Sequence, residues 1–371
     1  MKNPFLKTLY HSYIVKRHPG LSFRGGWILT HLFYKDYLAH KGNWLSVMNA
    51  HRKGWSYSDW CILGINEANR RHYLSTYDYC SLHPLNGNYS SWIDDKLILK
   101  YILHGTEAGS YMPDYYFQID DKGCIIPLMD YTAENGEADF HSIVALLKEK
   151  GCLAFKLMKG SLGKGFYKAA YQGGIFLLND ESMNEEKFIS RISALRGYIV
   201  TEFLKPHAVF RKYCDKSVGC LRYIIGRRLN RSLCDIYSFM RIGTSKSNYV
   251  ENYNSGGVLM VVRNGSFTNG NVLDFETNCN RVVANHPDNN LALKGEIPHW
   301  NRVVEAAHTI ARILPQMVYM GIDFCVTEDE RVKVIEINSL TSLDCIQMDK
   351  SIYDTDAGEF FRERLNKRRT T

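Results

Sequence analysis

The sequence predicts a mixed α/β protein of the α+β kind, with a mainly helical region at its N-terminus. The first stretch, to about residue 95, is rich in Tyr, Trp and His and lacks the β-branched alternation of strands, which indicates short helices and loops. From residue 152 onward, short apolar runs are separated by glycine-containing or polar turns, a pattern typical of antiparallel strands. Near residue 300 the apolar residues change to the spacing of a helix.

Length and composition limit the classes of protein. The 371 residues predict two or three domains, and the hydrophobic (45%) and charged (23%) fractions are those of a folded globular protein. A formal net charge of +7 requires no nucleic-acid partner, and we expect none. The ten cysteines include no Cys-x-x-Cys pair, so we expect reduced thiols. Because no signal-peptide pattern and no apolar run of ~20 residues occurs, we expect a cytoplasmic protein.

The N-terminal helical region ends in a turn-rich stretch from His83 to Asn88, and a helix is predicted at 95–103, where apolar residues recur at four-residue spacing. We therefore divide the chain into four parts. These are a helical region (1–95), a linker or first part of the next module (96–150), a smaller α/β subdomain (151–204) and a C-terminal subdomain (205–371).

The smaller subdomain is the most regular part of the sequence. Gly173 and Gly174 predict a tight hairpin, because paired glycines supply the positive φ that such turns need. Phe188, Ile192 and Leu195 fall on one helical face. The predicted elements are a strand (152–158), a glycine loop (159–165), two strands (166–171 and 175–178), a helix (184–195) and a strand (198–204).

The C-terminal subdomain predicts a larger antiparallel sheet and a helix. Three strands are expected at 217–227, 233–242 and 257–263. Trp300 to Leu314 carries apolar residues at 0, 3, 4, 7, 10, 11 and 14, which is one buried helical stripe. A last hairpin joins strands at 321–327 and 332–338.

This last hairpin predicts a cluster of oxygen ligands. A loop of two or four residues would pair Asp323 with Glu336, and their side chains would then share one face with Asn338. Two opposed carboxylates repel each other, so we expect something positive between them, and oxygen ligands favour Mg²⁺ or Mn²⁺ over zinc. The alternative is a solvent-facing strand edge.

Three further signals precede this hairpin. The loop Gly160-Ser161-Leu162-Gly163-Lys164-Gly165 links two strands, so it is either a flap that covers phosphates together with Lys156 or a loose hairpin tip. The end of the strand at Glu202, Phe203 and Leu204 either binds an adenine edge or is an ordinary buried strand. Arg222 lies on an apolar strand and needs a partner, either a triphosphate or an internal carboxylate.

In kind and in order, these signals resemble the ATP-grasp superfamily. They comprise the helix start Asp95-Lys96, Lys156 with its glycine loop, the Glu202 strand, the Arg222 strand, and Asp323 with Glu336-Ile337-Asn338. Between Arg222 and Asp323 the chain contains Asn252–Gly257, His286-Pro287-Asp288 and Ile297–Trp300. That pattern is similar to the sugar-transfer-associated ATP-grasp family of bacterial surface-polysaccharide loci.

The resemblance implies an ATP-grasp fold that binds ATP and two Mg²⁺ ions. The residues it implies are Lys96 and Lys156 for the phosphates, Gly160, Ser161, Gly163 and Gly165 for the lid, and Glu202, Phe203 and Leu204 for adenine. Asp323, Glu336 and Asn338 would bind the metal, and Arg222 would steady the transferred phosphoryl group. Gly256, Gly257 and His286 would face the acceptor, unless His286 is a capped loop histidine.

The resemblance also implies a reaction. We expect an ATP-dependent carboxylate–amine ligase that forms an amide through an acyl phosphate, joining an amine to a sugar acid of a capsule or O-antigen. A kinase and a non-catalytic nucleotide-binding subunit remain alternatives. D-Ala-D-Ala ligases carry an Arg two residues before the metal-binding Asp, where this chain has Gly321, so that particular reaction is not expected.

The C-terminus is basic. Arg362, Arg364, Lys367, Arg368 and Arg369 predict either a solvated tail or peripheral attachment to anionic lipid at the inner face of a membrane. The sequence does not indicate an oligomeric state.

Overall fold

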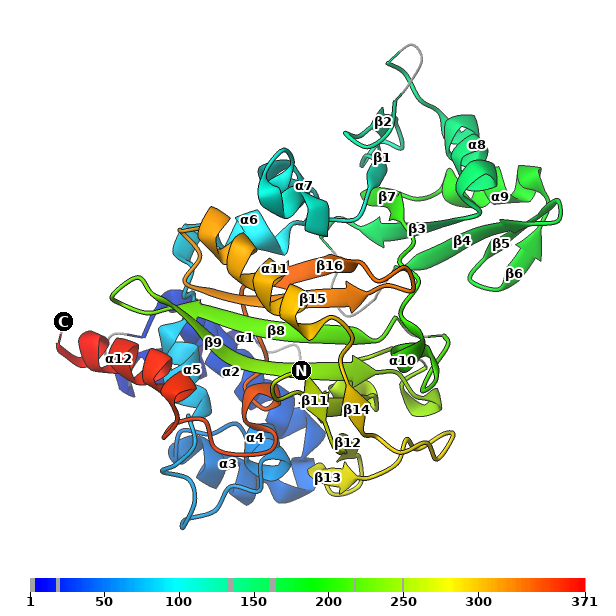
Figure 1. Cartoon of the computed structure of the whole chain (residues 1–371). Helices are drawn as coiled ribbons and strands as arrows, with labels where there is room; N and C mark the ends of the chain where they lie inside the picture. The colour runs from blue at the N-terminus through cyan, green and yellow to red at the C-terminus, as the bar shows by residue number, and fades with distance from the viewer. Residues whose placement is uncertain are drawn as a thin grey trace.

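The computed structural model describes residues 4–17, 21–132, 136–159, 165–216, 218–248 and 250–370. These residues form a group of N-terminal helices and two seven-stranded sheets (Figure 1). The smaller α/β subdomain with the first sheet lies at the upper right of the view, above the second sheet. The helices up to residue 82 lie toward the lower left, and the two helices between residues 90 and 103 lie above the second sheet. The predicted mixed fold with a helical N-terminal region is confirmed.

Short helices make up the N-terminal region because capping residues start them at close intervals. Ser22, Ser56, Ser75 and Asp95 each accept hydrogen bonds from main-chain N–H groups in the first turn of the helix that follows. The helices are α1 (Pro4–Arg17), α2 (Phe23–Ala39), α3 (Trp44–Arg52), α4 (Tyr57–Ile62), α5 (Thr76–Leu82), α6 (Ser90–Asp94) and α7 (Lys96–Leu103).

The first sheet has the strand order β2-β1-β7-β3-β4-β5-β6, and its own apolar core includes Phe117, Phe155 and Phe188. Its strands are β1 (Tyr115–Ile119), β2 (Ile125–Pro127), β3 (Cys152–Leu157), β4 (Tyr167–Gln172), β5 (Ile175–Leu178), β6 (Glu181–Met183) and β7 (Tyr198–Glu202), with helices α8 (Phe140–Lys150) and α9 (Glu185–Ile192). β1 and β2 come from the range that the sequence assigned to a linker. They are only five and three residues long, too short to show a strand pattern in the sequence. β1 becomes part of the sheet only by pairing with β7, about 80 residues away in the chain.

The second sheet has the order β13-β12-β10-β9-β8-β15-β16 and is antiparallel, as the sequence predicts. One face packs against α11 (Trp300–Ile313) together with α6 and α7, and the other packs against α3, α4, α5 and α12 (Asp356–Thr370). Its strands are β8 (Cys220–Arg227), β9 (Leu233–Ile242), β10 (Val258–Val261), β12 (Gly270–Asp274), β13 (Cys279–Val283), β15 (Tyr319–Val326) and β16 (Val332–Asn338), and β11 (Ser266–Phe267) pairs separately with β14 (Gly295–Glu296).

The β15–β16 hairpin pairs Asp323 with Glu336, which confirms the predicted register. The predicted loop length is wrong. Val326 pairs with Val332, so the turn contains an odd number of residues, and Glu330 within it has a positive φ of 63°. A bulge between Asp323 and Phe324 then shifts the register by one residue. The odd-numbered turn moves the register by one residue and the bulge moves it back, so Asp323 still pairs with Glu336.

Candidate functional site

Asp323 lies at the centre of a buried charge cluster on the second sheet. Its Oδ1 accepts a hydrogen bond of 2.6 Å from Nε of Arg222, and its Oδ2 accepts one of 2.5 Å from Nη2. Arg241 on the neighbouring strand β9 adds a bond of 3.1 Å from Nη2 to Oδ2. Burial opposes the charged form, but the two guanidinium groups outweigh it and hold the pKa of Asp323 below its ordinary value.

These contacts decide two alternatives that the sequence left open. Asp323 is only 2% exposed, so it does not lie on a solvent-facing strand edge. Arg222 has an internal carboxylate as its partner. Arg241 was missed by the sequence analysis, although it shows the same signal as Arg222, an arginine on an otherwise apolar strand.

Glu336 lies opposite Asp323 and is bound by a different cation. Its Oε2 is 3.1 Å from Nζ of Lys96, the first residue of α7, and its Oε1 accepts a 3.3 Å bond from the Asn338 amide. Nη2 of Arg222 lies 4.0 Å from Oε1. The positive charge expected between the two carboxylates is thus present as Lys96 and Arg222.

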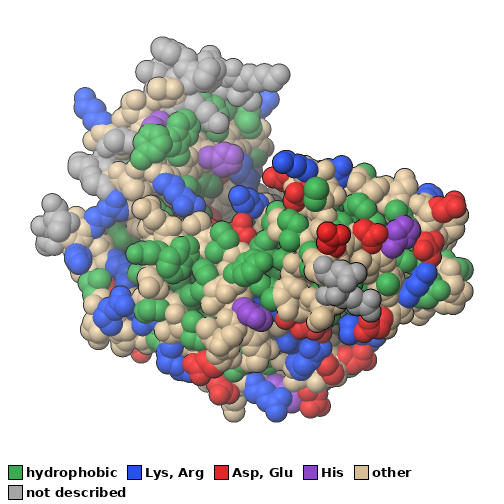
Figure 2. All heavy atoms as spheres, turned by 90° about the horizontal axis from the view of Figure 1, so that it is seen from above, with side chains coloured by type: hydrophobic (Ala, Val, Ile, Leu, Met, Phe, Trp, Pro, Cys, Tyr) green, Lys and Arg blue, Asp and Glu red, His purple; other side chains and the backbone are tan. Residues whose placement is uncertain are grey.

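Lys156 approaches the same place from strand β3 of the first sheet. Burial and then the neighbouring ammonium of Lys96 lower the pKa of Lys156 to about 8, and Glu336 offsets these effects only in part. Within the described ranges of the chain, Lys156 has no ion-pair or hydrogen-bond partner. Seen from above, the molecule is hollowed between its two lobes, with Lys and Arg side chains at the edge (Figure 2). Two ammonium groups therefore converge beside Glu336, and one of them lacks a counter-charge.

We expect ATP binding to weaken as the pH rises through about 8. Below this value Lys156 carries its proton and attracts phosphate, and above it the amine is neutral. With a pKa of about 8, the charged fraction falls from about nine tenths at pH 7 to about one tenth at pH 9, so the dissociation constant for ATP should rise roughly tenfold, as measured by calorimetry. Lys156→Arg keeps its charge throughout and should remove this dependence. An unchanged pH profile in that variant would show that another group titrates.

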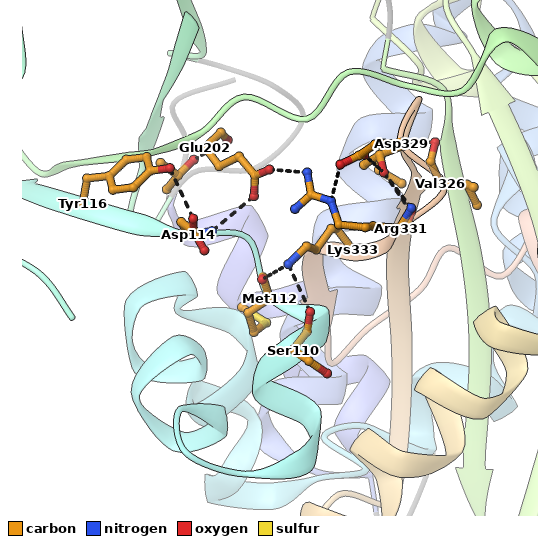
Figure 3. A network of polar contacts seen from close by, with 12 residues as sticks. Ser110, Met112, Asp114, Tyr116, Glu202, Val326, Asp329, Arg331 and Lys333 are labelled. Carbon is orange, nitrogen blue, oxygen red and sulfur yellow. Dashed lines mark hydrogen bonds and ion pairs between the residues drawn. The ribbon is translucent and has the colours of Figure 1, made fainter. Parts of the chain in front are cut away.

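The two sheets are joined by a hinge at the end of β7 (Figure 3). β7 ends at Glu202, two residues earlier than predicted, and the chain then runs beside the β15–β16 loop, where Lys205 O accepts from Glu328 N at 2.8 Å. Nη2 of Arg331 in this loop binds Glu202 Oε1 at 2.6 Å, and Lys333 donates to the main chain at Met112. The hairpin thereby holds the hinge in place.

The hinge leaves groups available for a flat heterocycle. Glu202 Oε2 receives only a long bond of 3.4 Å, from Asp114 N. Phe203 and Leu204 directly follow the last residue of β7, and Leu204 is buried. An adenine edge could bind main-chain groups here, and the ordinary-strand alternative stays open.

The residues partly fit a magnesium site. Glu336 and Asn338 offer a carboxylate and an amide oxygen, which are ligands that Mg²⁺ prefers. Asp323 already accepts three hydrogen bonds from Arg222 and Arg241, so a metal ion would have to share this carboxylate with them or displace one of them. Among the described residues, no group of three or more His, Cys, Asp or Glu side chains is already arranged to hold a metal. The two-ion site at Asp323, Glu336 and Asn338 therefore remains a prediction.

The predicted lid and acceptor residues are described only in part. Gly160, Ser161 and Gly163 lie outside the described residues, and of the predicted lid only Gly165 is placed, in a turn with φ 71°. His286 is 1% exposed and accepts a 3.4 Å bond from Asp288 N, as a capped loop histidine would. Burial lowers the pKa of His286.

Gly256 and Gly257 form the turn before β10. The carbonyl of Gly256 accepts a bond of 2.7 Å from the Thr244 hydroxyl, and Gly257 N–H donates to Asn252 O. Both glycines therefore have local structural partners, and a role toward an acceptor remains a prediction.

Gly321 could not be replaced by the arginine of D-Ala-D-Ala ligases. A Cβ there would lie 2.5 Å from Oγ1 of Thr341, which is buried. On the neighbouring strands, Arg222 and Arg241 supply guanidinium groups at the same face. The cationic group is thus present but comes from other positions.

The chain has two sheets joined at the end of β7, with a cluster of cations and carboxylates beside that connection. This arrangement is that of the ATP-grasp class of fold. The model of the sugar-transfer-associated ATP-grasp proteins matches residues 83–355, so the chain belongs to this family. A search among curated proteins found no match.

Solved structures with this fold resemble the chain at low identity. D-alanyl-alanine synthetase A from Vibrio cholerae O1 biovar eltor is 13% identical with a TM-score of 0.43, and the match covers 76% of this chain and 66% of that one. N5-carboxyaminoimidazole ribonucleotide synthetase from Thermotoga maritima is 13% identical with a TM-score of 0.38, covering 74% of this chain and 50% of that one. The chain thus spans about half the length of the latter. The biotin carboxylase domain of Hydrogenobacter thermophilus 2-oxoglutarate carboxylase, in complex with MgADP, is 11% identical with a TM-score of 0.39. The match covers 74% of this chain and 46% of that one.

Proposed function

We propose that this protein is an ATP-dependent carboxylate–amine ligase. The observation that carries the proposal is the convergence of Lys96 and Lys156 beside Glu336, with Lys156 unpaired among the described residues. Two ammonium groups next to a single carboxylate leave positive charge that a triphosphate would neutralise. The main chain of Phe203 and Leu204, just after β7, would hold the adenine of the same nucleotide.

The reaction begins with attack of a substrate carboxylate oxygen on the γ-phosphorus, which releases ADP and forms an acyl phosphate. An amine then attacks the carbonyl carbon, phosphate leaves, and the amine loses a proton to give the amide. Activation is needed because a carboxylate is a poor electrophile. Bound Mg²⁺ would neutralise charge on the phosphate oxygens.

Arg222 and Arg241 would take the role that an arginine at position 321 cannot fill. Nη1 of each guanidinium has no hydrogen-bond partner among the described residues, while their Nη2 atoms bind Asp323. These free donors would bind the substrate carboxylate and then stabilise charge on the acyl phosphate. Asp323 would hold both groups in position.

We propose a sugar acid as the carboxylate substrate and an amino acid or similar amine as its partner, in the assembly of a surface polysaccharide such as a capsule or O-antigen. The support is the family itself, which is described as sugar-transfer-associated. Such a substrate would be recognised at the face of β8, β9 and β15.

The test is a screen for ADP release with pairs of uronic acids or nucleotide-sugar acids and amino acids. ADP release that requires both partners is expected, with ¹⁸O from the labelled carboxylate appearing in the released phosphate. ADP release without an amine, together with a stable phosphorylated product, would identify a kinase instead. ATP binding without ADP release from any pair would favour a non-catalytic subunit.

A further inference from the structure

The N-terminal helices expose an unusual amount of apolar surface. Eight of the eighteen exposed large apolar side chains among the described residues lie between Tyr13 and Met48, about a tenth of the chain. Phe23 is 72% exposed, Leu45 65% and Trp44 53%. Single exposed apolar residues are normal, but this concentration indicates an interaction surface. We call the exposed side chains of α2 and α3 the N-terminal surface.

On α2 the exposed apolar side chains share one stripe with His31 and Lys35. Phe23, Trp27, His31, Lys35 and Leu38 are all exposed and recur at 0, 4, 8, 12 and 15, which places them within one third of the helix circumference. Phe23 and Trp27 lie edge to face with ring centroids 6.2 Å apart. α3 contacts α2 and adds Trp44, Leu45 and Met48.

The same region is strongly basic. Residues 1–58 contain nine Lys and Arg but a single acidic residue, Asp36. Asp36 is 1% exposed and is held inside by His51 and by the start of α4, so it does not offset the exposed cations. Lys35 lies within the stripe on α2, and Arg24 and Lys41 are exposed in the same region. Aromatic and leucine side chains flanked by cations are typical of helices that lie in a membrane interface.

The N-terminal surface also borders the candidate site. Arg24 and Ile28 of α2 line a small crevice with Ser339 and Leu340, which directly follow Asn338 on the metal-binding strand. Ser339 is fixed by two hydrogen bonds to Asp94, so this end of β16 is rigidly placed beside α2. Any partner that contacts α2 would thus lie close to the candidate site.

We propose that the N-terminal surface docks the protein onto a bilayer that contains anionic phospholipid. Charge complementarity selects this partner, because exposed cations surround the apolar stripe and the one acidic residue of the segment is buried. No helix in the described part of the chain is both long and apolar enough to span a bilayer, so docking would be peripheral.

The C-terminal tail serves this purpose less well. Its helix α12 also carries Glu359 and Glu363, and the guanidinium of Arg364 is bound to Glu363 and to the main chain of Arg227 and Phe360. The docking proposal goes beyond the ligase proposal and needs no nucleotide, so each can fail separately.

The test is co-sedimentation of the full chain with vesicles of phosphatidylcholine alone or with 30% phosphatidylglycerol, about the anionic content that attracts basic segments. Binding to the anionic vesicles is expected, with weakening as salt rises. Phe23→Ser with Trp27→Ser should lower the partition coefficient at least tenfold, and Arg24→Glu with Lys35→Glu should do the same. Leu229→Ser with Ile175→Ser, which remove exposed apolar side chains elsewhere, should not.

A second readout locates the contact. Brominated phosphatidylcholine should quench the tryptophan fluorescence of the wild type, and Trp27→Phe with Trp44→Phe should remove most of that quenching. Equal circular dichroism spectra would show that the variants fold. Absence of binding to anionic vesicles would overturn the proposal, as would a dimer in light scattering that the Phe23→Ser and Trp27→Ser changes convert to a monomer.

Discussion

Replacing Glu336 by Gln is expected to reduce ADP release at least about a hundredfold, the scale of losing one charge-stabilising group in a transition state. The change removes the proposed magnesium ligand and the partner of Lys96 in one step. Stability should also fall, because Lys96 is only 8% exposed and would lose its counter-charge. Steady-state kinetics with ADP detection and urea unfolding measure the two effects.

Glu330→Gln is the matched control. Glu330 lies in the loop of the same hairpin, its side chain is 66% exposed, and its one ion pair is a long contact of 3.7 Å to His299. This variant should retain wild-type turnover. Full activity of Glu336→Gln would remove Glu336 from the site, and equal losses in both variants would indicate a general disturbance of the hairpin.

Replacing Asp323 by Asn is expected to lower the free energy of unfolding by ~3–5 kcal/mol and to abolish turnover. The loss is large because two guanidinium groups, Arg222 and Arg241, would remain buried without their counter-charge. Urea unfolding at pH 7 measures it. Asp329→Asn, which removes an equally short bond to Arg331 from a 60% exposed side chain, should change stability by at most ~1 kcal/mol.

The contribution of Asp323 to stability should also depend on pH. Its pKa is lower in the folded chain than in the unfolded chain, so its stabilising effect is complete above the unfolded value of about 3.9. The effect is lost as the pH falls through the lower folded value. The wild type should therefore lose more stability than Asp323→Asn between pH 5 and pH 2. Parallel acid profiles of the two proteins would contradict the charged Asp323 assigned here.

Local patterns in the sequence predicted most of the elements and one key contact. The apolar stripe at 300–314 and the strands around Arg222 follow from spacing between near neighbours, and α11 and β8 appear at those places. The Asp323–Glu336 pairing was predicted with the wrong loop, because a bulge compensates for an unpredicted turn. β1 and β2 were not predicted, because strands this short depend on pairing with β7 for their stability.

The sequence by itself determined most of the elements, the order of those elements and the chemical types in the candidate site, since these depend on side chains within a few residues of one another. Only the tertiary structure decided that Lys96 binds Glu336, that Arg222 and Arg241 share Asp323, and that Lys156 lacks a partner among the described residues. These groups come from one helix and five strands in two sheets, up to about 240 residues apart. Their charges meet because the sheets and α7 bury apolar faces against each other, and no spacing along the chain encodes that geometry.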